Sequence, residues 1–501
     1  MDDDSRPRIC VTVGGATTAE LRQARDAVGD ADLVELRLDA VSDPDPAGAL
    51  AGRTRPVLVT CRAAWEGGHF QGPEEERLRL LAEAWSLGAE YVDLEQRAPG
   101  AAAFLERTSG RRVVLSRHDF EGVPRDIAGT FRSLAAAPAE VVKLAVTATR
   151  VSDALPLFDL RGAAASRPFV ALAMGSAGVA TRLLAARIGS RWSYAGSAAP
   201  GQMAATLMID GFRYRSVGPT TAVYGVAGNP VMHSLSPAMH NAAFAAAGID
   251  AVYVPIEAAD AADVLAFAEG VGMPGISVTS PFKLALAAAA RLDDTARQVG
   301  ALNTLRRHAG GWEGTNTDPE GFLAPLEPRL PLDGARAAVL GAGGAARAVV
   351  TALRSRGARV AVHARRPGQA SEIARLLDVQ AAPWPPAPGS WDLLVNTTPV
   401  GTAPRSDESP WPDGVFDGRL VYDLVYNPPV TRLMRQAASA GCATLGGLEM
   451  LVGQAQKQFQ WWTGVRPEAA VMRMAALRRL AAEARGGLEA SGAPPVVPIE
   501  P

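Results

Sequence analysis

Residues 140–146 read EVVKLAV, an apolar β-like run with a lysine, Lys143, at its centre. The first 210 residues contain seven more such runs, at residues 9–14, 32–38, 56–61, 90–95, 112–117, 168–174 and 191–196. The runs recur every 22–34 residues, which is the usual spacing of successive βα units. Eight such units predict an α/β fold that begins with a (βα)8 TIM barrel, in which catalytic side chains gather at the carboxyl ends of the strands.

Lysine is rare in this chain, because only Lys143, Lys283 and Lys457 occur among 50 basic residues. Arginine serves wherever a fixed cation suffices, whereas a lysine can lose its proton and act as a nucleophile or proton carrier. Lys143 and Lys283 both belong to β-like runs or their ends, where active sites are commonly assembled. The alternative is chance loss of lysine from a sequence rich in Ala, Gly, Arg and Pro, so the neighbouring residues must decide.

The bulk composition restricts the class of protein. A chain of 501 residues with 48% hydrophobic residues predicts several globular domains. The net charge of −2 argues against nucleic acid or an anionic membrane as partner, so we expect small-molecule substrates and a monomer or small homo-oligomer. Cys10, Cys61 and Cys442 are too dispersed for a disulfide framework or a metal site. The first residues are acidic and do not resemble a signal peptide. Together with the dispersed cysteines, they predict a cytoplasmic, metal-free protein.

The remaining sequence divides at changes in pattern. We expect a barrel over residues 1–213, a linker over 214–221, an α/β substrate-binding domain over 222–331 to which 451–480 return, and a Rossmann domain over 332–450. The Pro-rich stretch LAPLEPRLPLDG separates the last two. The composition of residues 483–501 predicts a disordered tail.

Polar residues gather at the ends of several barrel runs. They are Glu35, Arg37 and Asp39 in the second run, Arg62 and Glu66 after the third, His118 and Asp119 after the fifth, and Lys143 in the sixth. His118 alone could be a satisfied core group, but so many polar strand ends indicate an active site.

Imine catalysis suits these residues. Arg37 and Arg62, together with desolvating barrel walls, favour the neutral amine of Lys143, which can attack a ketone. His118 can move the proton of the adjacent carbon, and the arginines can hold an anionic substrate.

The motifs VELRLD (34–39), TCRAAWEGG (60–68), LSRHDF (115–120), VVKLAV (141–146), GVATR (178–182) and APGQ (199–202) span the first domain. In this order they resemble type I 3-dehydroquinate dehydratases. The resemblance implies that Lys143 forms a Schiff base, that His118 is the general acid and base, and that Glu66 orients it. It also implies substrate contacts from Glu35, Arg37, Arg62, Arg182 and Gln202. Ala198 stands where the family usually has Ser, and we expect this to weaken binding modestly.

A glycine-rich turn, GAGGAA at 341–346, follows a β-like run and opens a helical one. Such a turn lets a pyrophosphate approach the helix N-terminus. NAD sites place a carboxylate after the second strand, but this chain has Ala364-Arg365-Arg366 there. Arginine suits a 2′-phosphate, so NADP is favoured over NAD. A solvated basic turn is the alternative interpretation.

The middle segment supplies candidate substrate contacts. HSLSP places Ser234 and Ser236 on a predicted loop, where two hydroxyls can hold a carboxylate, although a helix cap is the simpler explanation. VTSPFK places Thr279 and Lys283 at a strand end, and GTNTD presents Asp318. A Lys–Asp pair can relay a proton while a nicotinamide transfers the hydride.

Residues 222–480 resemble shikimate dehydrogenases through YGVAGNPVMHSLSP, VTSPFK, GALNT, NTDPEGF, VLGAGGAARA, LLVNTTPVG, VYDLVYNPPVT and GGLEMLVGQA. The resemblance implies Lys283 and Asp318 as the catalytic pair. It implies shikimate contacts from Ser234, Ser236, Thr279, Asn303, Tyr426 and Gln454. Cofactor contacts fall on Gly341, Gly343, Gly344, Ala345, Arg365, Asn396 and Thr397. Many relatives have Asn at the position of Ser277.

The sequence therefore predicts a bifunctional enzyme of aromatic amino-acid biosynthesis that uses NADP(H) and no metal. The barrel would dehydrate 3-dehydroquinate, and the second half would reduce the product to shikimate. One alternative is an oxidative quinate/shikimate dehydrogenase with a dehydratase domain. Another is a non-catalytic sensor or repressor of the quinate pathway, which the retained lysines and the lack of a basic DNA-binding segment disfavour.

Overall fold

The computed structural model describes residues 7–164, 167–199, 201–411 and 413–491. Contacts divide the chain into two compact units. One unit comprises Met1–Met232 and Asp250–Met273, and the other comprises His233–Ile249 and Pro274–Pro501. Among the described residues, no helix combines the length and the apolar character needed to cross a membrane.

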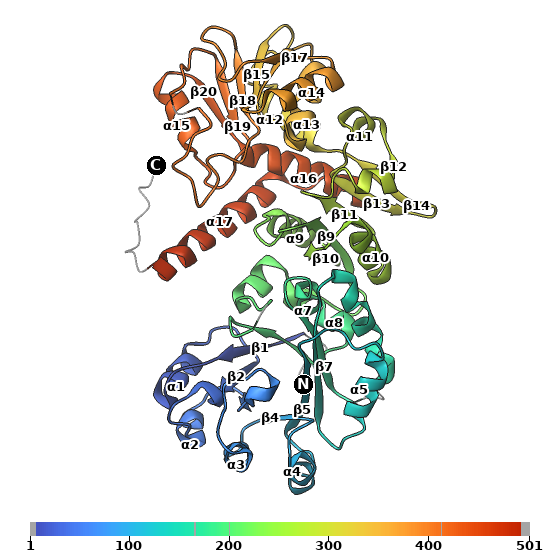
Figure 1. Ribbon diagram of the computed structural model, residues 1–501, viewed down its shortest axis with the longest axis vertical. Helices are drawn as coiled ribbons and strands as arrows, with labels where there is room; N and C mark the ends of the chain where they lie inside the picture. The colour runs from blue at the N-terminus through green and yellow to red at the C-terminus, as the bar shows by residue number, and fades with distance from the viewer. Residues whose placement is uncertain (1–6, 165–166, 200, 412, 492–501) are drawn as a thin grey trace. The chain divides into compact units, whose positions relative to one another are not determined.

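The first unit contains the predicted barrel (Figure 1). Its eight strands are β1 (Arg8–Val13), β2 (Leu33–Arg37), β3 (Val57–Thr60), β4 (Tyr91–Glu95), β5 (Val113–Asp119), β6 (Val141–Thr147), β7 (Phe169–Met174) and β8 (Trp192–Ala195). They form a parallel sheet in the order β7-β6-β5-β4-β3-β2-β1-β8. Strands β7 and β8 also pack together, with the Arg191 amide donating to the Phe169 carbonyl at 2.7 Å. The predicted TIM barrel is confirmed as a nearly closed one.

The segments between the barrel strands are helical, but unequal in length. The long ones are α1 (Thr18–Ala27), α3 (Glu74–Ser86), α4 (Ala101–Thr108) and α5 (Ile127–Ala135), and a short α2 (Pro46–Leu50) follows β2. After β6 the chain forms a 3-10 helix, η3 (Val151–Asp159), before α6 (Leu160–Ala163). Pro156 lies inside η3, and its missing N–H interrupts regular α-helical bonding there. Apolar side chains of the strands and helices form one core between the two layers.

The first unit continues beyond the barrel into a parallel pair, β9 (Ala222–Gly228) and β10 (Ala251–Glu257), followed by α10 (Ala261–Val271). Asp263 of α10 accepts hydrogen bonds from the backbone of Val151 and Ser152 in η3, at 3.1 and 2.9 Å. Arg187 donates to the carbonyls of Thr221 and Val271 at 2.8 and 3.1 Å. These hydrogen bonds fasten β9, β10 and α10 to the barrel.

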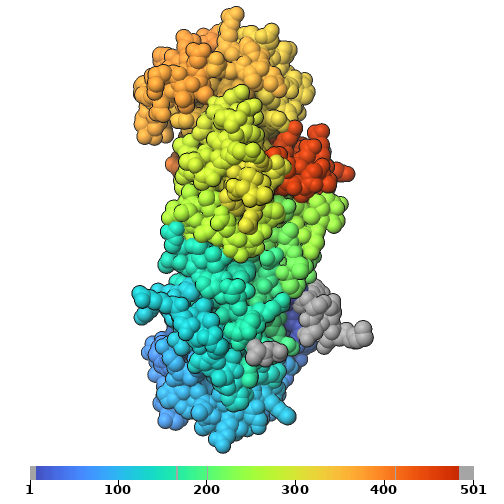
Figure 2. Space-filling view, turned by 90° about the vertical axis from the view of Figure 1, so that its right-hand side faces the viewer, coloured from blue at the N-terminus to red at the C-terminus, as the bar shows by residue number. Residues whose placement is uncertain are grey.

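The second unit begins with α9 (Ser236–Ala246) and strands β11 (Gly275–Val278), β13 (Thr304–His308), β14 (Gly311–Thr315) and β12 (Arg291–Leu292). Helix α12 (Asp318–Leu326) packs on α16 (Gly447–Thr463), and α17 (Ala469–Ser491) packs on α9. The surface of α17, red in Figure 2, adjoins the light green surface of the α9 segment. Helix α17 continues through Ser491 and so includes the first residues of the predicted tail, which begins at Glu483. Residues 492–501 of that tail lie outside the described residues.

A six-stranded parallel sheet completes the second unit. Its strands are β15 (Arg336–Leu340), β16 (Arg359–His363), β17 (Gln380–Ala382), β18 (Leu393–Asn396), β19 (Leu420–Asp423) and β20 (Ala443–Gly446). They lie in the order β17-β16-β15-β18-β19-β20, which is the 3-2-1-4-5-6 order of a dinucleotide-binding Rossmann fold. Helix α13 (Gly344–Arg354) follows β15 directly and α14 (Pro367–Leu377) follows β16. In such a sheet, ligands bind beyond the carboxyl ends of β15 and β18, where the strand order reverses.

Candidate active sites

The barrel interior holds a buried network around Lys143. Lys143 Nζ lies 3.4 Å from Asp93 Oδ2, and Asp93 also accepts from Arg62 at 2.9 Å and from Ser116 at 2.5 Å. Burial alone would raise the pKa of Asp93, but Arg62 and Lys143 hold it below its usual value. The carboxylate therefore keeps its charge and holds the Lys143 and Arg62 side chains in the interior.

His118 and Glu66 form a second pair at the same end of the barrel. Glu66 is buried at the end of a short 3-10 turn, η2 (Ala64–Glu66), and its Oε1 accepts from the His118 amide at 2.9 Å and lies 3.0 Å from Nδ1. Burial, followed by the charges of Arg62 and Lys143, lowers the pKa of His118 well below its usual value. The imidazole is thus neutral at neutral pH, with its other ring nitrogen able to accept a proton.

The side chains of Glu35 and Gln202 both contact the Thr12 hydroxyl in the barrel interior. Glu35 accepts from Thr12 at 2.7 Å and from Thr60 at 2.8 Å, and Gln202 Nε2 lies 3.4 Å from the same Thr12 oxygen. Gln202 Oε1 also accepts from the Ala198 amide at 2.9 Å. The Ala198 backbone therefore helps to orient Gln202, whichever side chain stands at position 198.

The two remaining predicted arginines differ in environment. Arg37 makes a bidentate pair with Asp39, at 2.8 and 2.7 Å, and remains partly exposed. Arg182 lies in α7 (Val179–Leu183) and is 2% exposed. Burial lowers the pKa of Arg182 to about 10, so the guanidinium stays cationic at neutral pH.

Several functional residues of the barrel were missed by the sequence interpretation. Asp93 and Glu95 of β4 both point inward and bond Arg62, and the Tyr194 ring centroid lies 4.3 Å from Lys143 Nζ. The signal for the two acids was present, because EYVDLE places them two residues apart and hence on one face of a strand. Tyr194 gave no comparable signal, since aromatic residues are ordinary in strands.

The second unit brings Lys283 and Asp318 together. Lys283 Nζ donates to Asp318 Oδ2 at 2.6 Å, and Asn303 Nδ2 donates to Asp318 Oδ1 at 2.8 Å. Gln454 Oε1 lies 3.5 Å from the same Asn303 nitrogen. Asp318 is the first residue of α12, where the helix dipole favours a negative charge. Four of the predicted side chains thus form one network.

The other four predicted residues have no hydrogen bond to this network in the part of the chain that the structure describes. Ser234 accepts from the Ser236 amide at 3.2 Å. Ser236 is the first residue of α9, so the expected loop ends one residue earlier than predicted. Thr279 directly follows β11, in the turn that leads to Lys283. Tyr426 lies shortly after β19, and burial raises its pKa.

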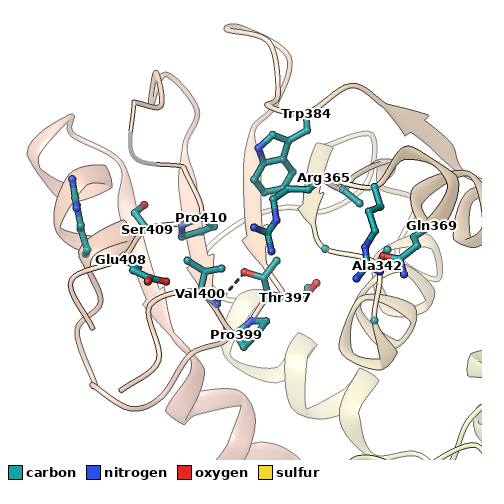
Figure 3. Close-up of a pocket in the computed structure, with 16 residues that line it drawn as sticks. Ala342, Arg365, Gln369, Trp384, Thr397, Pro399, Val400, Glu408, Ser409 and Pro410 are labelled. Carbon is teal, nitrogen blue, oxygen red and sulfur yellow. Dashed lines mark hydrogen bonds between the residues drawn. The ribbon is translucent and has the colours of Figure 1, made fainter. Parts of the chain in front are cut away.

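A cavity of about 520 Å³ lies beyond the carboxyl ends of β15, β16 and β18. Gly341, Gly343, Arg365 and Thr397 line it (Figure 3). Gly341 has φ +111°, and a Cβ there would lie 2.6 Å from Thr397 Oγ1, so glycine is required. Gly343 faces open space, which leaves room for a phosphate at the start of α13.

Arg365 extends below the Trp384 ring towards Thr397 in this cavity (Figure 3). The loop that carries Trp384 is held by His363, whose Nδ1 lies 2.7 Å from the Pro383 carbonyl. Arg366 and Gln369 line the same side. Residues 364–366, which directly follow β16, include no carboxylate.

Asn396 is placed differently from the other predicted cofactor residues. It is fully buried and donates to Asp423 at 2.8 Å, while its Oδ1 accepts from Thr398. Gly344 and Ala345 open α13 behind Gly343 and are not among the residues that line the cavity. In the described part of the chain, no group of three or more His, Cys, Asp or Glu residues could hold a metal ion.

Two separate chemistries therefore occur in one chain. The barrel offers an amine and a neutral base to a carbonyl compound, and the second unit offers a proton relay and a dinucleotide cavity. These features define a bifunctional lyase and oxidoreductase. Family models agree: residues 9–219 match type I 3-dehydroquinase, 226–305 match the shikimate dehydrogenase substrate binding domain, and 447–477 match the shikimate 5′-dehydrogenase C-terminal domain.

The chain belongs to the family of bifunctional 3-dehydroquinate dehydratases/shikimate dehydrogenases. The bifunctional chloroplastic enzyme of Arabidopsis thaliana is 33% identical over 475 residues, covering 87% of this chain and 78% of the relative. The shikimate dehydrogenase (NADP(+)) of Salinibacter ruber is 42% identical over 273 residues, covering 50% of this chain and 96% of the relative. A solved Thermus thermophilus shikimate 5-dehydrogenase with NADP(H) and shikimate is 37% identical, covers 52% of this chain and 99% of its own, and has a TM-score of 0.48. The predicted family, fold class and pair of activities are confirmed.

Proposed function

We propose that Lys143 and His118 carry out the dehydration of 3-dehydroquinate, and that Lys283 and Asp318 carry out the reduction of 3-dehydroshikimate to shikimate. The observation that supports the first assignment best is the buried position of Lys143, whose Nζ lies 3.4 Å from Asp93 in the same barrel interior as His118. The observation that supports the second is the 2.6 Å contact between Lys283 and Asp318.

In the barrel, the neutral Lys143 amine attacks the ring ketone, and loss of water leaves a protonated imine. The imine draws electrons from the adjacent carbon, so His118 can remove its proton. The β-hydroxyl then leaves and takes that proton from His118, forming water and the carbon–carbon double bond. Hydrolysis of the imine releases the product and regenerates Lys143. Glu66 holds Nδ1, which leaves the other ring nitrogen for both proton transfers.

The substrate contacts follow from charge and position. Arg182 is a buried cation suited to the substrate carboxylate. Glu35 and Gln202, joined through Thr12, are suited to ring hydroxyls. Arg62 is fully engaged with Asp93 and Glu95, so its main contribution is the positive charge that it adds to the site. Arg37, partly exposed beside Asp39, completes the set of substrate residues.

In the second unit, Lys283 donates the proton that the substrate oxygen gains as the ketone becomes an alcohol. Asp318 holds the ammonium, and Asn303 holds Asp318 at the required angle. NADPH supplies the hydride. Ser234 and Ser236 are suited to the carboxylate, while Thr279, Gln454 and Tyr426 are suited to the hydroxyls and the ring.

NADP(H) fits the residues of the cavity. Gly341 and Gly343 leave space for the pyrophosphate, and Thr397 borders the same opening with its hydroxyl fixed to the Leu340 carbonyl at 2.7 Å. Arg365 is suited to the 2′-phosphate. Gly344, Ala345 and Asn396 support the residues that line the cavity. Neither of the two proposed reactions uses a metal ion.

We also propose the domain limits derived from the sequence: a barrel over 1–213, a linker over 214–221, a substrate domain over 222–331 with 451–480, and a cofactor domain over 332–450. The packing of α16 on α12 and of α17 on α9 supports the return of the C-terminal segment. A cytoplasmic location, a monomer or small homo-oligomer, and the lack of nucleic-acid and membrane partners are proposed on composition and on three free thiols.

Borohydride trapping tests the barrel assignment. Borohydride reduces an imine to a stable amine, so it should inactivate the dehydratase only when 3-dehydroquinate is present, with the added mass on Lys143. Inactivation without substrate, or a mass on another residue, would remove the assignment. Lys283→Met tests the second half: NADPH-dependent reduction should fall about 10²–10⁴-fold, while the dehydratase of the same chain stays active.

A further inference from the structure

Arg97 follows β4 and approaches the carboxylate that holds His118. Glu66 Oε1 already bonds the His118 amide and faces Nδ1. Glu66 Oε2 is buried and lacks a hydrogen-bond partner in the part of the chain that the structure describes. Arg97 Nη2 lies 3.5 Å from this second oxygen, within the range of an ion pair but longer than an ordinary hydrogen bond.

Trp65 supports Arg97 from the neighbouring turn. The Arg97 guanidinium carbon lies 5.9 Å from the centroid of the Trp65 ring, which is a cation–π distance. Trp65 itself is 48% exposed, an unusual position for so large an apolar side chain, and its contact with Arg97 accounts for it. The Arg97 side chain is 55% exposed, whereas that of Glu66 is fully buried. Arg97 thus reaches from the solvent to a buried member of the site.

We propose that Arg97, supported by Trp65, is a positioning residue for the dehydratase. It holds the second oxygen of Glu66 so that the first oxygen keeps the His118 ring in its working orientation. Its positive charge also helps to keep His118 in the neutral form that accepts the substrate proton. This inference rests on the roles proposed above for Glu66 and His118.

The charged groups around His118 and its partner Glu66 come from several strands. They belong to Arg37 of β2, Arg62 after β3, Glu95 of β4, Arg97 after β4 and Lys143 of β6. Burial and the four cations lower the pKa of His118, and burial raises that of Glu66 against the opposing charges of Arg62 and Arg97. Arg97 is the most exposed of the four cations. It can therefore be replaced without breaking the buried network.

Arg97→Met tests the proposal in the full-length enzyme. We expect kcat for dehydration to fall about fivefold, the rate equivalent of one ion pair, with little change in KM. The acidic limb of the pH profile of kcat should move to higher pH, because His118 without this cation holds its proton at higher pH. Arg97→Lys keeps the charge and should restore most of the activity and the position of that limb.

Arg79→Met is the matched control. Arg79 of α3 is 62% exposed and pairs with Glu83 at 3.0 Å, so its loss should leave both kcat and the pH profile unchanged. Circular dichroism and thermal unfolding report correct folding of each variant, since reduction of 3-dehydroshikimate takes place in the other unit. A rise in KM alone would identify Arg97 as a substrate contact and overturn the positioning role. An unchanged kcat and pH profile in Arg97→Met would overturn it as well. Full dehydratase activity in His118→Ala would instead refute the proposed function itself.

Discussion

Gln458 Oε1 accepts a 2.7 Å hydrogen bond from the Ser277 hydroxyl, and both side chains are buried. Gln458 Nε2 donates to the Asn303 carbonyl at 3.3 Å, and the Asn303 side chain in turn holds Asp318. Gln458 thus connects Ser277 to the Lys283–Asp318 pair through buried hydrogen bonds.

Gln458→Leu removes both bonds, together with the hydrogen bond between Gln458 and His240, while keeping the side-chain volume similar. We expect the free energy of unfolding to fall by about 1–3 kcal/mol and kcat/KM for shikimate to fall, with dehydration unchanged. Urea unfolding and the two activity assays measure these effects. Gln460→Leu, at an exposed position of the same helix, is the control, and an equal loss there would contradict the role of Gln458.

Arg365 should determine the choice between NADPH and NADH. A charge-assisted contact with the 2′-phosphate is worth about 1.5–3 kcal/mol, so Arg365→Ser should raise KM for NADPH about 10–100-fold. KM for NADH should change little, because that cofactor lacks the phosphate. Arg375→Ser, at an exposed position of α14, should change neither constant. Equal losses with both cofactors in Arg365→Ser would place the arginine elsewhere on the cofactor.

The pattern of strands allowed the fold to be predicted, because each barrel run is apolar and is separated from the next run by the length of about one helix. The pattern of strands does not reveal local departures from helical bonding, such as the one that Pro156 causes in η3. Local composition likewise does not reveal tertiary contacts, such as the packing of α17 on α9.

Some residues of the candidate sites can be recognised in the sequence, and others cannot. Lys143 and His118 stand out because polar residues are unexpected at strand ends. Asp93 was overlooked although its spacing from Glu95 marks one face of β4. Gln458 could not be recognised, since its role depends on the side chain of Ser277, which lies 181 positions away in the sequence.

Stability should decrease in acid partly through His240 of α9. This histidine is fully buried, and burial, opposed by a hydrogen bond with Gln458, lowers its pKa to about 3. An unfolded histidine binds its proton near pH ~6.5, so between these two values the unfolded state holds more protons than the folded one. The free energy of unfolding should therefore fall by ~1.4 kcal/mol per pH unit as the pH drops through this interval.

His240→Phe keeps an aromatic ring beside Phe459 and Trp462 and removes the titration. Urea unfolding at several pH values within the interval should give a shallower dependence for this variant, by about the slope of one group. The lowered pKa values of His118 and His363 act in the same direction in both proteins and cancel in the comparison. Identical slopes would show that His240 is protonated in the folded state.

Exchange of lysine for arginine should separate two of the three lysines of this chain by function. Lys457 is about half exposed and pairs with Glu320 at 2.6 Å, a role that a guanidinium fills equally well. Lys143 must lose its proton to form an imine, which a guanidinium cannot do. Lys143→Arg should therefore lower the dehydratase kcat by roughly 10⁴-fold or more, although it keeps the charge opposite Asp93. Lys457→Arg should leave both activities and the free energy of unfolding within error of the parent. Parallel assays of both variants with 3-dehydroquinate decide the matter, because dehydration by Lys143→Arg at a rate close to that of the parent would mean that the barrel works without an imine.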